Sequence, residues 1–149
     1  MVIEKVLITG GTGMVGKSFN NLDNKYDFIF VGSNDYDLRN TAETDFMIRD
    51  LNPDAVIHLA ARVGGVHSNS EYISDFFKDN IMINTNVLDA SRRFGIKKVV
   101  SLLSTCVYPD DAKYPLTPEQ FNDGPPHPSN FGYAYAKRMV DVYSRALRQ

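Results

Sequence analysis

Short apolar runs recur along the chain, and more polar stretches with helical spacing separate them. The runs are rich in β-branched residues, and most are apolar on both faces, which is typical of strands buried in a parallel sheet. The pattern predicts strands at Val2–Thr9, Asp27–Val31, Ala55–Ala61 and Lys97–Cys106, with a very short additional strand at Asp37–Leu38.

The stretches between these runs predict helices. Their bounds are Met14 to about Leu22, Thr41–Leu51, Ser70–Phe94 and Phe131–Gln149. Thr41 is the expected N-cap of its helix, and Gly95 is the expected residue after the Ser70–Phe94 helix. Phe77, Ile81 and Leu88 should share one apolar stripe of that helix. Six of the seven prolines fall within residues 108–130, which predicts an irregular loop there.

Strands that alternate with helices predict an α/β fold, a doubly wound parallel sheet of the Rossmann type with right-handed crossovers. No strand pattern follows the last predicted helix, whereas a complete sheet of this type usually has a sixth strand. We therefore expect residues 1–149 to be an incomplete domain, truncated from the front part of a longer protein. The strand at Lys97–Cys106 should then lie at an edge of the sheet.

Composition and charge narrow the range of partners. The 149 residues are 43% hydrophobic and 23% charged, which is typical of one globular domain. Lys and Arg number 16 and Asp and Glu 18, so the net charge of −2 argues against nucleic acid and membrane surfaces as partners. No apolar stretch is long enough to span a membrane. The one cysteine, Cys106, excludes an internal disulfide and favours a reducing, cytoplasmic location. No metal is expected.

A glycine-rich loop follows the first predicted strand. Its glycines at positions 10, 13 and 16 give the pattern G-x-x-G-x-x-G, and a helix opens directly after them. Such a loop has few side chains, so backbone N–H groups and the helix N-terminus can approach a pyrophosphate. We therefore predict dinucleotide binding by Gly10, Gly11, Thr12, Gly13, Met14, Val15 and Gly16.

The end of the second predicted strand bears on the choice of dinucleotide. NAD sites usually place an acidic residue there to bind the ribose 2′-hydroxyl. Here the strand ends in Val31 and Gly32, and Asp35 lies slightly beyond. Ser33 and Asn34 could donate hydrogen bonds to a 2′-phosphate, and no acid sits where it would repel one. The sequence thus leans toward NADP(H).

A tyrosine and a lysine lie near the start of the last predicted helix. Tyr133 and Lys137 are four residues apart and therefore share a helix face. Lowering a tyrosine pKa from about 10 to about 7 requires roughly 4 kcal/mol. An ammonium about 4 Å away supplies about that much at an effective dielectric constant of about 20. We expect Lys137 to lower the pKa of Tyr133 and make it a proton donor near neutral pH.

Two further candidates follow the predicted strand at Lys97–Cys106. Ser104 should lie at its carboxyl end, where open parallel sheets bind ligands, and could hold a carbonyl oxygen beside the tyrosine proton. Cys106 is two residues further along and should point to the same face of the strand.

These motifs together resemble the extended short-chain dehydrogenase/reductase family. The glycine loop, the segment His58–Ala61, Ser104, and Tyr133 with Lys137 carry the resemblance, as does Asn80–Ala90. More specific segments are similar to the GDP-L-fucose synthase branch of that family, namely Val63–Gly65, Leu103–Pro109, Asn122–His127 and Asn130–Tyr133.

The resemblance implies an NADPH-dependent 3,5-epimerase and 4-reductase that converts GDP-4-keto-6-deoxy-D-mannose to GDP-L-fucose, and a homodimer in the full-length form. It makes Tyr133 the acid for reduction, Lys137 the ligand of the nicotinamide ribose, Ser104 the ligand of the keto oxygen and Cys106 an acid/base for epimerisation. The family's partner histidine has no match here, since His58, His67 and His127 are interpreted as structural. The implied cofactor-lining residues, beyond the loop, Tyr133 and Lys137, are Ser33, Asn34, Asp37, Leu38, Leu59, Ala60, Ala61, Asn80, Leu102 and Leu103.

Two alternatives remain open at this level. One is another sugar-nucleotide epimerase or dehydratase of the same family, which Cys106 argues against because those relatives look different there. The other is a non-catalytic nucleotide-binding protein. Ser104, Tyr133 and Lys137 argue against it, since a binding protein needs no proton donor.

Overall fold

The fold is described from a computed structural model that covers residues 2–22 and 25–148. These residues form two compact units. The first unit comprises the residues up to Ala61 together with Met82–Leu102, and the second comprises Arg62–Ile81 together with the residues from Leu103 onward.

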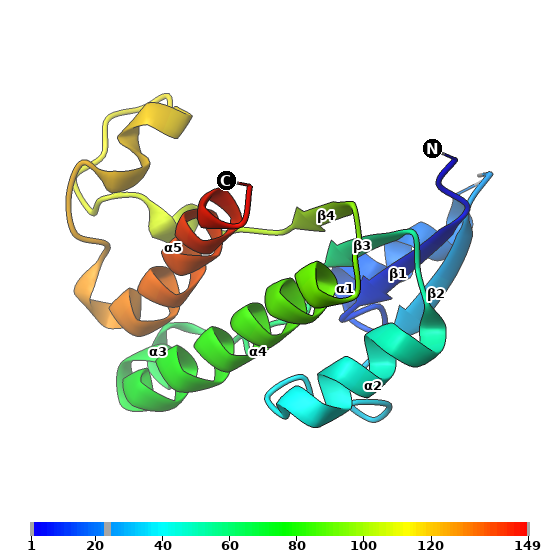
Figure 1. Cartoon of the computed structure of the whole chain (residues 1–149). Helices are drawn as coiled ribbons and strands as arrows, with labels where there is room; N and C mark the ends of the chain where they lie inside the picture. Colours follow the sequence, from blue (N-terminus) through cyan, green and yellow to red (C-terminus); the bar gives the residue numbers. More distant parts are fainter. Residues whose placement is uncertain (1, 23–24, 149) are drawn as a thin grey trace. The chain divides into compact units, whose positions relative to one another are not determined.

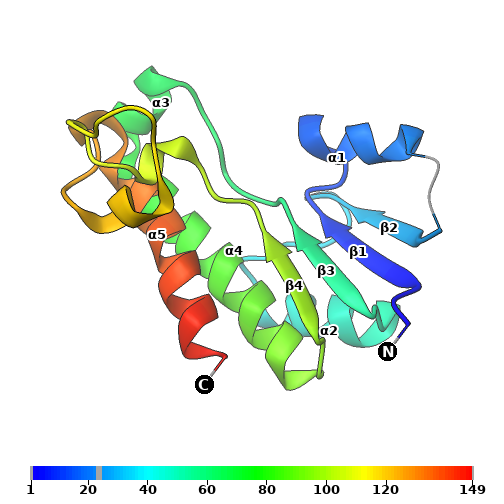
Figure 2. The same ribbon diagram turned by 90° about the horizontal axis from the view of Figure 1, so that it is seen from above.

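The first unit is built on a parallel sheet. Its strands are β1 (Lys5–Thr9), β2 (Asp27–Val31), β3 (Ala55–His58) and β4 (Lys98–Ser101), in the order β2-β1-β3-β4 (Figures 1 and 2). Leu7 on β1 pairs with Ile29 on β2 and with Val56 on β3. Because the chain runs from β1 first to one side and then to the other, the doubly wound prediction is confirmed. The predicted edge position of β4 is also observed among the described residues.

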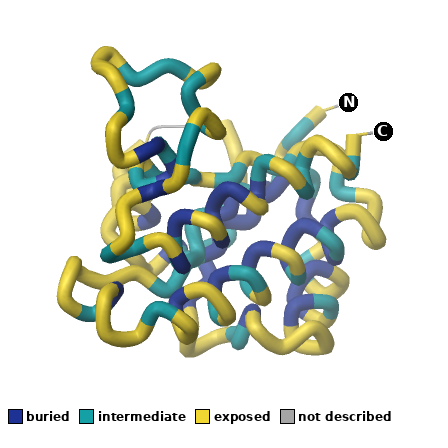
Figure 3. Tube along the Cα trace, turned by 90° about the vertical axis from the view of Figure 1, so that its left-hand side faces the viewer, coloured by how far each residue is buried: buried dark blue, intermediate teal, exposed yellow. Residues whose placement is uncertain are grey.

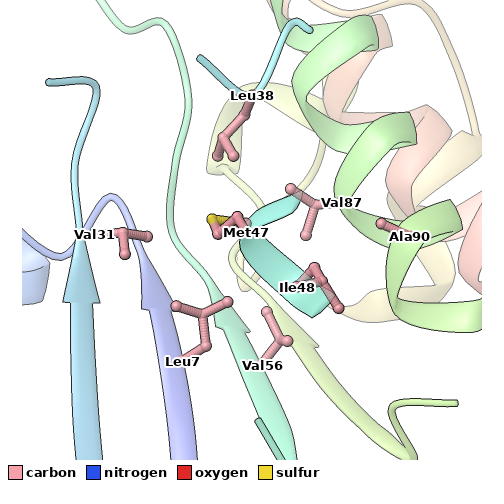
Figure 4. Packing of buried hydrophobic residues seen from close by; sticks show 8 residues of the cluster. All are labelled: Leu7, Val31, Leu38, Met47, Ile48, Val56, Val87 and Ala90. Carbon is pink, nitrogen blue, oxygen red and sulfur yellow. The ribbon is translucent and has the colours of Figure 1, made fainter. Parts of the chain in front are cut away.

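The hydrophobic core of this unit lies between the sheet and two of its helices. Helix α1 (Met14–Ser18) continues into a 3₁₀ helix, η1 (Phe19–Asn21), while α2 (Thr41–Leu51) and the later part of α4 (Ile73–Arg93) pack on the sheet. Figure 4 shows Met47 and Ile48 of α2 among sheet residues such as Leu7 and side chains of α4. Burying each such side chain contributes about 1.5–3 kcal/mol to the stability of this unit.

The predicted strand at Asp37–Leu38 is wrong, because other partners take the backbone groups of that segment. The N–H of Asp37 donates to the Glu43 carboxylate at 2.8 Å. The carbonyl of Leu38 accepts from Thr44 Oγ1 and from Asn86 Nδ2. These bonds fold residues 38–40 into a turn before α2. The predicted strands at Val2–Thr9 and Ala55–Ala61 exist but are shorter than predicted.

Helix α2 has the predicted bounds but a different cap. Asn40 is the N-cap, since its side chain accepts from the N–H groups of Ala42 and Glu43. Thr41, which was expected there, instead donates its hydroxyl to Asn86 Oδ1 at 3.0 Å. Helix α2 ends at Leu51, and the residue that caps its C-terminus, Asn52, has a left-handed φ of 43°.

The second unit contains one long helix, the first part of another, and several short helical turns. Its elements are α3 (Val66–Glu71), the start of α4, the 3₁₀ helices η2 (Thr105–Val107), η3 (Pro118–Asn122) and η4 (Pro128–Asn130), and α5 (Phe131–Ala146). Helix α3 packs on η4, and α5 packs on η2 and η4. The predicted irregular loop at residues 108–130 is therefore mostly irregular but includes two 3₁₀ turns.

The predicted helix at Ser70–Phe94 is divided in two. Tyr72 has a φ of −115° and a ψ of 41°, which interrupts the helix between α3 and α4. Within α4 the predicted stripe is partly wrong, because Leu88 is buried but Phe77 is 43% exposed. Two asparagines, Asn80 and Asn84, lie on the buried face. A purely apolar pattern overlooks that face because polar residues occupy part of it. Gly95 follows the helix with a φ of 74°, as predicted.

The strand predicted at Lys97–Cys106 ends at Ser101. Leu102 still donates its N–H to the His58 carbonyl, but the chain then leaves the sheet. The Ser104 side chain accepts the Cys106 N–H at 3.2 Å and caps the 3₁₀ turn of η2. The prediction that Ser104 and Cys106 share one strand face is therefore wrong, and a capped turn presents them instead.

The last helix ends at Ala146, before the predicted end at Gln149, which lies outside the described residues. Figure 3 shows that buried and exposed positions alternate along the helices, so that each long helix has a buried and an exposed face. No helix in the described part of the chain is both long and apolar enough to cross a membrane.

Candidate active site

In the second unit, the side chains of Ser104 and Cys106 lie beside the Tyr133 phenol. Tyr133 lies in the first turns of α5, and the Ser104 hydroxyl hydrogen-bonds its oxygen. Cys106 lies close enough for a charge on its sulfur to act on the phenol. Ser104 also accepts the backbone N–H of Cys106, so one hydroxyl links the two other groups. The structure thus brings together three of the four catalytic residues predicted from the sequence.

The pKa of Tyr133 moves in the opposite direction from the one predicted. Burial raises it above its usual value of 10.0, and the neighbouring Cys106 charge raises it further, while the Ser104 hydrogen bond lowers it. Desolvation disfavours the phenolate, and here it outweighs the hydrogen bond. The expected lowering of the Tyr133 pKa is therefore wrong, and the tyrosine keeps its proton at neutral pH.

Lys137 lies one turn after Tyr133 on α5 and is only 2% exposed. Burial lowers the pKa of its ammonium from 10.5 to about 8. At pH 7 the side chain is therefore still charged but destabilised by the loss of water. A buried ammonium of this kind favours ligands that offer it oxygen acceptors, such as ribose hydroxyls.

The side chain of Asn80 is fully buried and already engaged. Its Oδ1 accepts the N–H of Arg62 at 3.0 Å, and its Nδ2 donates to the carbonyls of Arg62 and Phe76 at 2.9 and 2.8 Å. In this structure Asn80 therefore fixes the segment that follows β3, and its predicted contact with a cofactor stays a prediction.

Two glycines of the loop in the first unit lie where a side chain would meet backbone atoms. Gly10 has a φ of 68°, and a Cβ there would lie 2.8 Å from backbone atoms of Ala60. A Cβ on Gly16 would lie 2.4 Å from the Gly11 carbonyl oxygen. These two positions therefore require glycine. Met14 and Val15 open α1, where backbone N–H groups have no acceptor within the helix.

The residues after β2 are arranged around a turn. Ser33 and Asn34 are exposed there. The Asp35 carboxylate accepts the Gly32 N–H at 2.7 Å, so it closes its own turn. Asp37 is bonded to Arg39, which lowers the Asp37 pKa.

Other predicted cofactor-lining residues differ in exposure. The Leu38 side chain belongs to the hydrophobic core and is 8% exposed, so it offers little surface to a ligand. Leu59, Ala60 and Ala61 follow β3 and are half-buried, as is Leu103, while Leu102 is exposed.

Two of the three histidines, His58 and His127, are engaged in hydrogen bonds within the fold, whereas His67 is exposed. His58 is fully buried and bonds Thr9 Oγ1 at 2.7 Å and Asn84 Oδ1 at 3.1 Å. His127 accepts the Ser129 N–H and caps η4, and the exposed His67 lies 3.6 Å from the Glu71 carboxylate. Among the described residues, no group of three His, Cys, Asp or Glu side chains is placed to hold a metal ion.

The sequence analysis did not identify three residues that hold the second unit in place. Asn69 donates to the carbonyls of Gly64 and Gly65, Arg62 pairs with Asp79, and Arg138 is buried. Arg138 had a usable signal, because it lies four residues after Ala134 on the inward face of α5.

The sequence of this chain is similar to those of known enzymes of one family. The model of the NAD dependent epimerase/dehydratase family matches residues 6–149. The chain is 47% identical to the GDP-L-fucose synthase of Dictyostelium discoideum, over 97% of this chain and 47% of that protein. It is 46% identical to the probable GDP-L-fucose synthase of Drosophila melanogaster, over 97% of this chain and 46% of that protein.

A solved structure of a GDP-L-fucose synthetase from Naegleria fowleri, bound to NADP, is also similar. It superposes with a TM-score of 0.88 at 42% identity, over 97% of this chain and 44% of that one. The chain therefore spans about half the length of the curated relatives it matches.

Proposed function

Because the chain belongs to the NAD dependent epimerase/dehydratase family, we propose that it is the cofactor-binding part of an NADPH-dependent 3,5-epimerase and 4-reductase. The proposed substrate is GDP-4-keto-6-deoxy-D-mannose and the product GDP-L-fucose. Residues 1–149 then form the NADP-binding domain, and the rest of the sugar-nucleotide site lies outside this sequence. The observation that carries the proposal is the Ser104–Cys106–Tyr133 cluster.

The cluster suits a keto sugar because it offers two kinds of proton chemistry side by side. A keto group at C4 acidifies the protons on C3 and C5. Cys106, as a thiolate, would remove such a proton, and the electron pair would move onto the keto oxygen held by Ser104. Return of a proton to the opposite face of the carbon inverts the centre. The acid that returns it has no counterpart among the three histidines of this chain.

Reduction at C4 requires a proton as well as a hydride. Bound NADPH supplies the hydride chemistry. Tyr133 would donate its proton to the oxygen on C4 and so complete the hydroxyl. Its raised pKa keeps that proton in place at neutral pH until the oxygen becomes basic, which suits a general acid.

The fit of the chain to NADP(H) rests on the glycine loop and on the turn after β2. The loop, from Gly10 to Gly16, would hold the diphosphate against the N–H groups that open α1. The Asp35 carboxylate is engaged with the Gly32 N–H, and the exposed Ser33 and Asn34 would donate hydrogen bonds to a 2′-phosphate. Lys137 would bind the hydroxyls of the nicotinamide ribose.

The proposal extends to a homodimer in the cytoplasm, with no nucleic acid or membrane as partner. The single cysteine supports a reducing compartment, because a lone thiol needs no oxidising environment. Light scattering of the native protein measures the oligomeric state.

Titration with NADPH, followed by nicotinamide fluorescence, tests the cofactor part of the proposal. We expect saturable binding by this chain, with weaker binding of NADH. Absence of a saturable signal at millimolar NADPH, with circular dichroism showing a folded chain, would rule it out.

Two substitutions in the full-length protein that carries this sequence test the catalytic part. Tyr133→Phe should lower reduction by about 10²–10⁴-fold, while C3 and C5 protons still exchange with deuterated water. Cys106→Ser should slow that exchange and leave hydride transfer possible. Mass spectrometry of the recovered sugar nucleotide measures both. If Tyr133→Phe stops exchange as completely as it stops reduction, the separate roles are wrong.

A further inference from the structure

Arg138 is a buried cation that the proposed chemistry does not use. It lies on α5 directly after Lys137 and is 7% exposed. Its Nε donates to the Val107 carbonyl at 2.7 Å, and its Nη2 donates to the Gly124 carbonyl at 2.8 Å. The guanidinium also lies 5.3 Å from the centre of the Tyr135 ring. Within the part of the chain that the structure describes, two backbone carbonyls rather than a carboxylate compensate this charge.

Both carbonyls belong to segments with little regular structure of their own. Val107 ends the three-residue helix η2 and directly follows Cys106. The backbone bonds of η2 are short-range, from the Val107 N–H to Ser104 and from the Tyr108 N–H to Thr105, both at 3.2 Å. Turns of this length have poor hydrogen-bond geometry and are weak alone. The charged bond from Arg138 Nε on α5 to the Val107 carbonyl therefore constrains where η2 lies.

We propose that Arg138 is a positioning residue for the reaction, an inference that rests on the proposed function. Its guanidinium ties η2 to α5, and this fixes the Cys106 thiol relative to the Tyr133 phenol. The planar fork is needed because Nε and Nη2 point at two carbonyls from different segments. A lysine ammonium reaches such a pair less well, since its three donors diverge from one point.

The hydrogen bond from Arg138 to Val107 should matter more for epimerisation than for reduction. Cys106 is adjacent to the tethered residue, whereas Ser104 is three residues away and is also bonded to Tyr133. A displacement of about 1 Å costs about 10²-fold in rate for a reacting group. Loss of the tether should therefore slow proton exchange at C3 and C5 more than hydride transfer to C4.

The test uses the full-length native protein with Arg138→Met and Arg138→Lys. The matched control is Arg145→Met, on the same helix, because the Arg145 side chain is 60% exposed and pairs with Asp141. The first measurement is the rate at which iodoacetamide alkylates the Cys106 peptide, as a function of pH and without substrate. The second is deuterium incorporation at C3 and C5, with kcat and KM determined separately.

We expect Arg138→Met to change the alkylation rate of Cys106 by about tenfold, because the thiol is no longer held in one place. The kcat for exchange should fall by about 10²-fold with KM within about twofold, since the change moves a reacting group and not the sugar-nucleotide site. Arg138→Lys should recover part of both, and Arg145→Met should match the wild type.

A folded Arg138→Met protein with unchanged alkylation and exchange would overturn the proposal, whatever its melting temperature. If the methionine variant does not fold, the lysine variant decides by the same two readouts. If neither folds, Arg138 serves the fold rather than the reaction, and the proposal is wrong. If the wild type itself shows no exchange, the proposed function fails, and the alkylation profile alone then decides the role of Arg138.

Discussion

Different kinds of interaction stabilise the interior of each of the two units. The first unit has four parallel strands in register and a core of apolar side chains such as Leu7, Val56 and Met47. The second has no strand among its described residues, and side chains that bond the backbone fix many of its turns. Asn80 holds the segment at Arg62, and Arg138 holds Val107 and Gly124.

The first unit is therefore suited to act as a scaffold, and the second to hold reacting side chains. A parallel ladder with a dry core is regular, so it supports a loop that binds through backbone N–H groups. A proton-transfer site needs several different side chains at one point, and irregular segments that polar side chains hold can supply them. Substitutions should therefore act through steric overlap and apolar packing in the first unit, and through lost hydrogen bonds and buried charge in the second.

The largest effect is expected at the glycine loop. A Cβ on Gly16 would lie 2.4 Å from the Gly11 carbonyl oxygen and 2.5 Å from its Cα, and backbone atoms do not yield easily. Gly16→Ala should cost about 3 kcal/mol or more and weaken NADPH binding at least 10²-fold. Calorimetry and fluorescence titration measure the two effects. Gly65→Ala is the matched control, because nothing lies within 4 Å of a Cβ there. Equal behaviour of both variants would contradict the steric argument.

The next effect compares one asparagine from each unit, Asn80 from the second and Asn86 from the first. Asn80→Ala removes three hydrogen bonds from a fully buried side chain and leaves backbone groups of Arg62 and Phe76 without them. It should destabilise the fold by about 2–3 kcal/mol. Asn86→Ala, in the first unit, removes two bonds from a half-buried side chain and should cost about 1 kcal/mol. Urea unfolding gives both values, and a larger loss for Asn86→Ala would reverse the comparison.

The third effect depends on pH. The Lys137 pKa is about 8 in the folded chain and near 10.5 when unfolded. Between these values the unfolded state binds more protons, so the stability of the wild type should rise with pH across that window. Lys137→Met removes the buried charge and should be more stable than the wild type by about 3 kcal/mol at pH 7.

This advantage should shrink as the pH rises from about 8 to 10.5, because the wild-type ammonium then loses its charge. Chemical denaturation at several pH values measures it. A constant difference between the variant and the wild type across that range would show that Lys137 is not desolvated as described.

The smallest effect concerns a helix cap in the first unit. Asn40 caps α2, so Asn40→Ala should cost about 1 kcal/mol. Thr41→Ala removes one exposed hydroxyl bond and should cost less. If the threonine change is the more costly in thermal unfolding, the cap assignment based on geometry is wrong.

The candidate site was predictable residue by residue but not in its geometry. Ser104, Cys106, Tyr133 and Lys137 stood out because of their chemistry and spacing. The prediction that Lys137 lowers the Tyr133 pKa failed because burial, which spacing does not reveal, dominates that group. The strand predicted through Cys106 failed because the Ser104 side chain takes a backbone N–H and starts a turn.

The sequence by itself determined the parallel sheet, the glycine loop and the i, i+4 pair at Tyr133 and Lys137. These features follow from local periodicity and from backbone conformations that only certain residues adopt. Only the tertiary structure decided which buried asparagines hold which loops, that Arg138 is tied to Val107, and which way the pKa of Tyr133 moves. Each of those depends on contacts between groups far apart in the sequence and on the exclusion of water. A local sequence pattern reveals neither the contacts nor the burial.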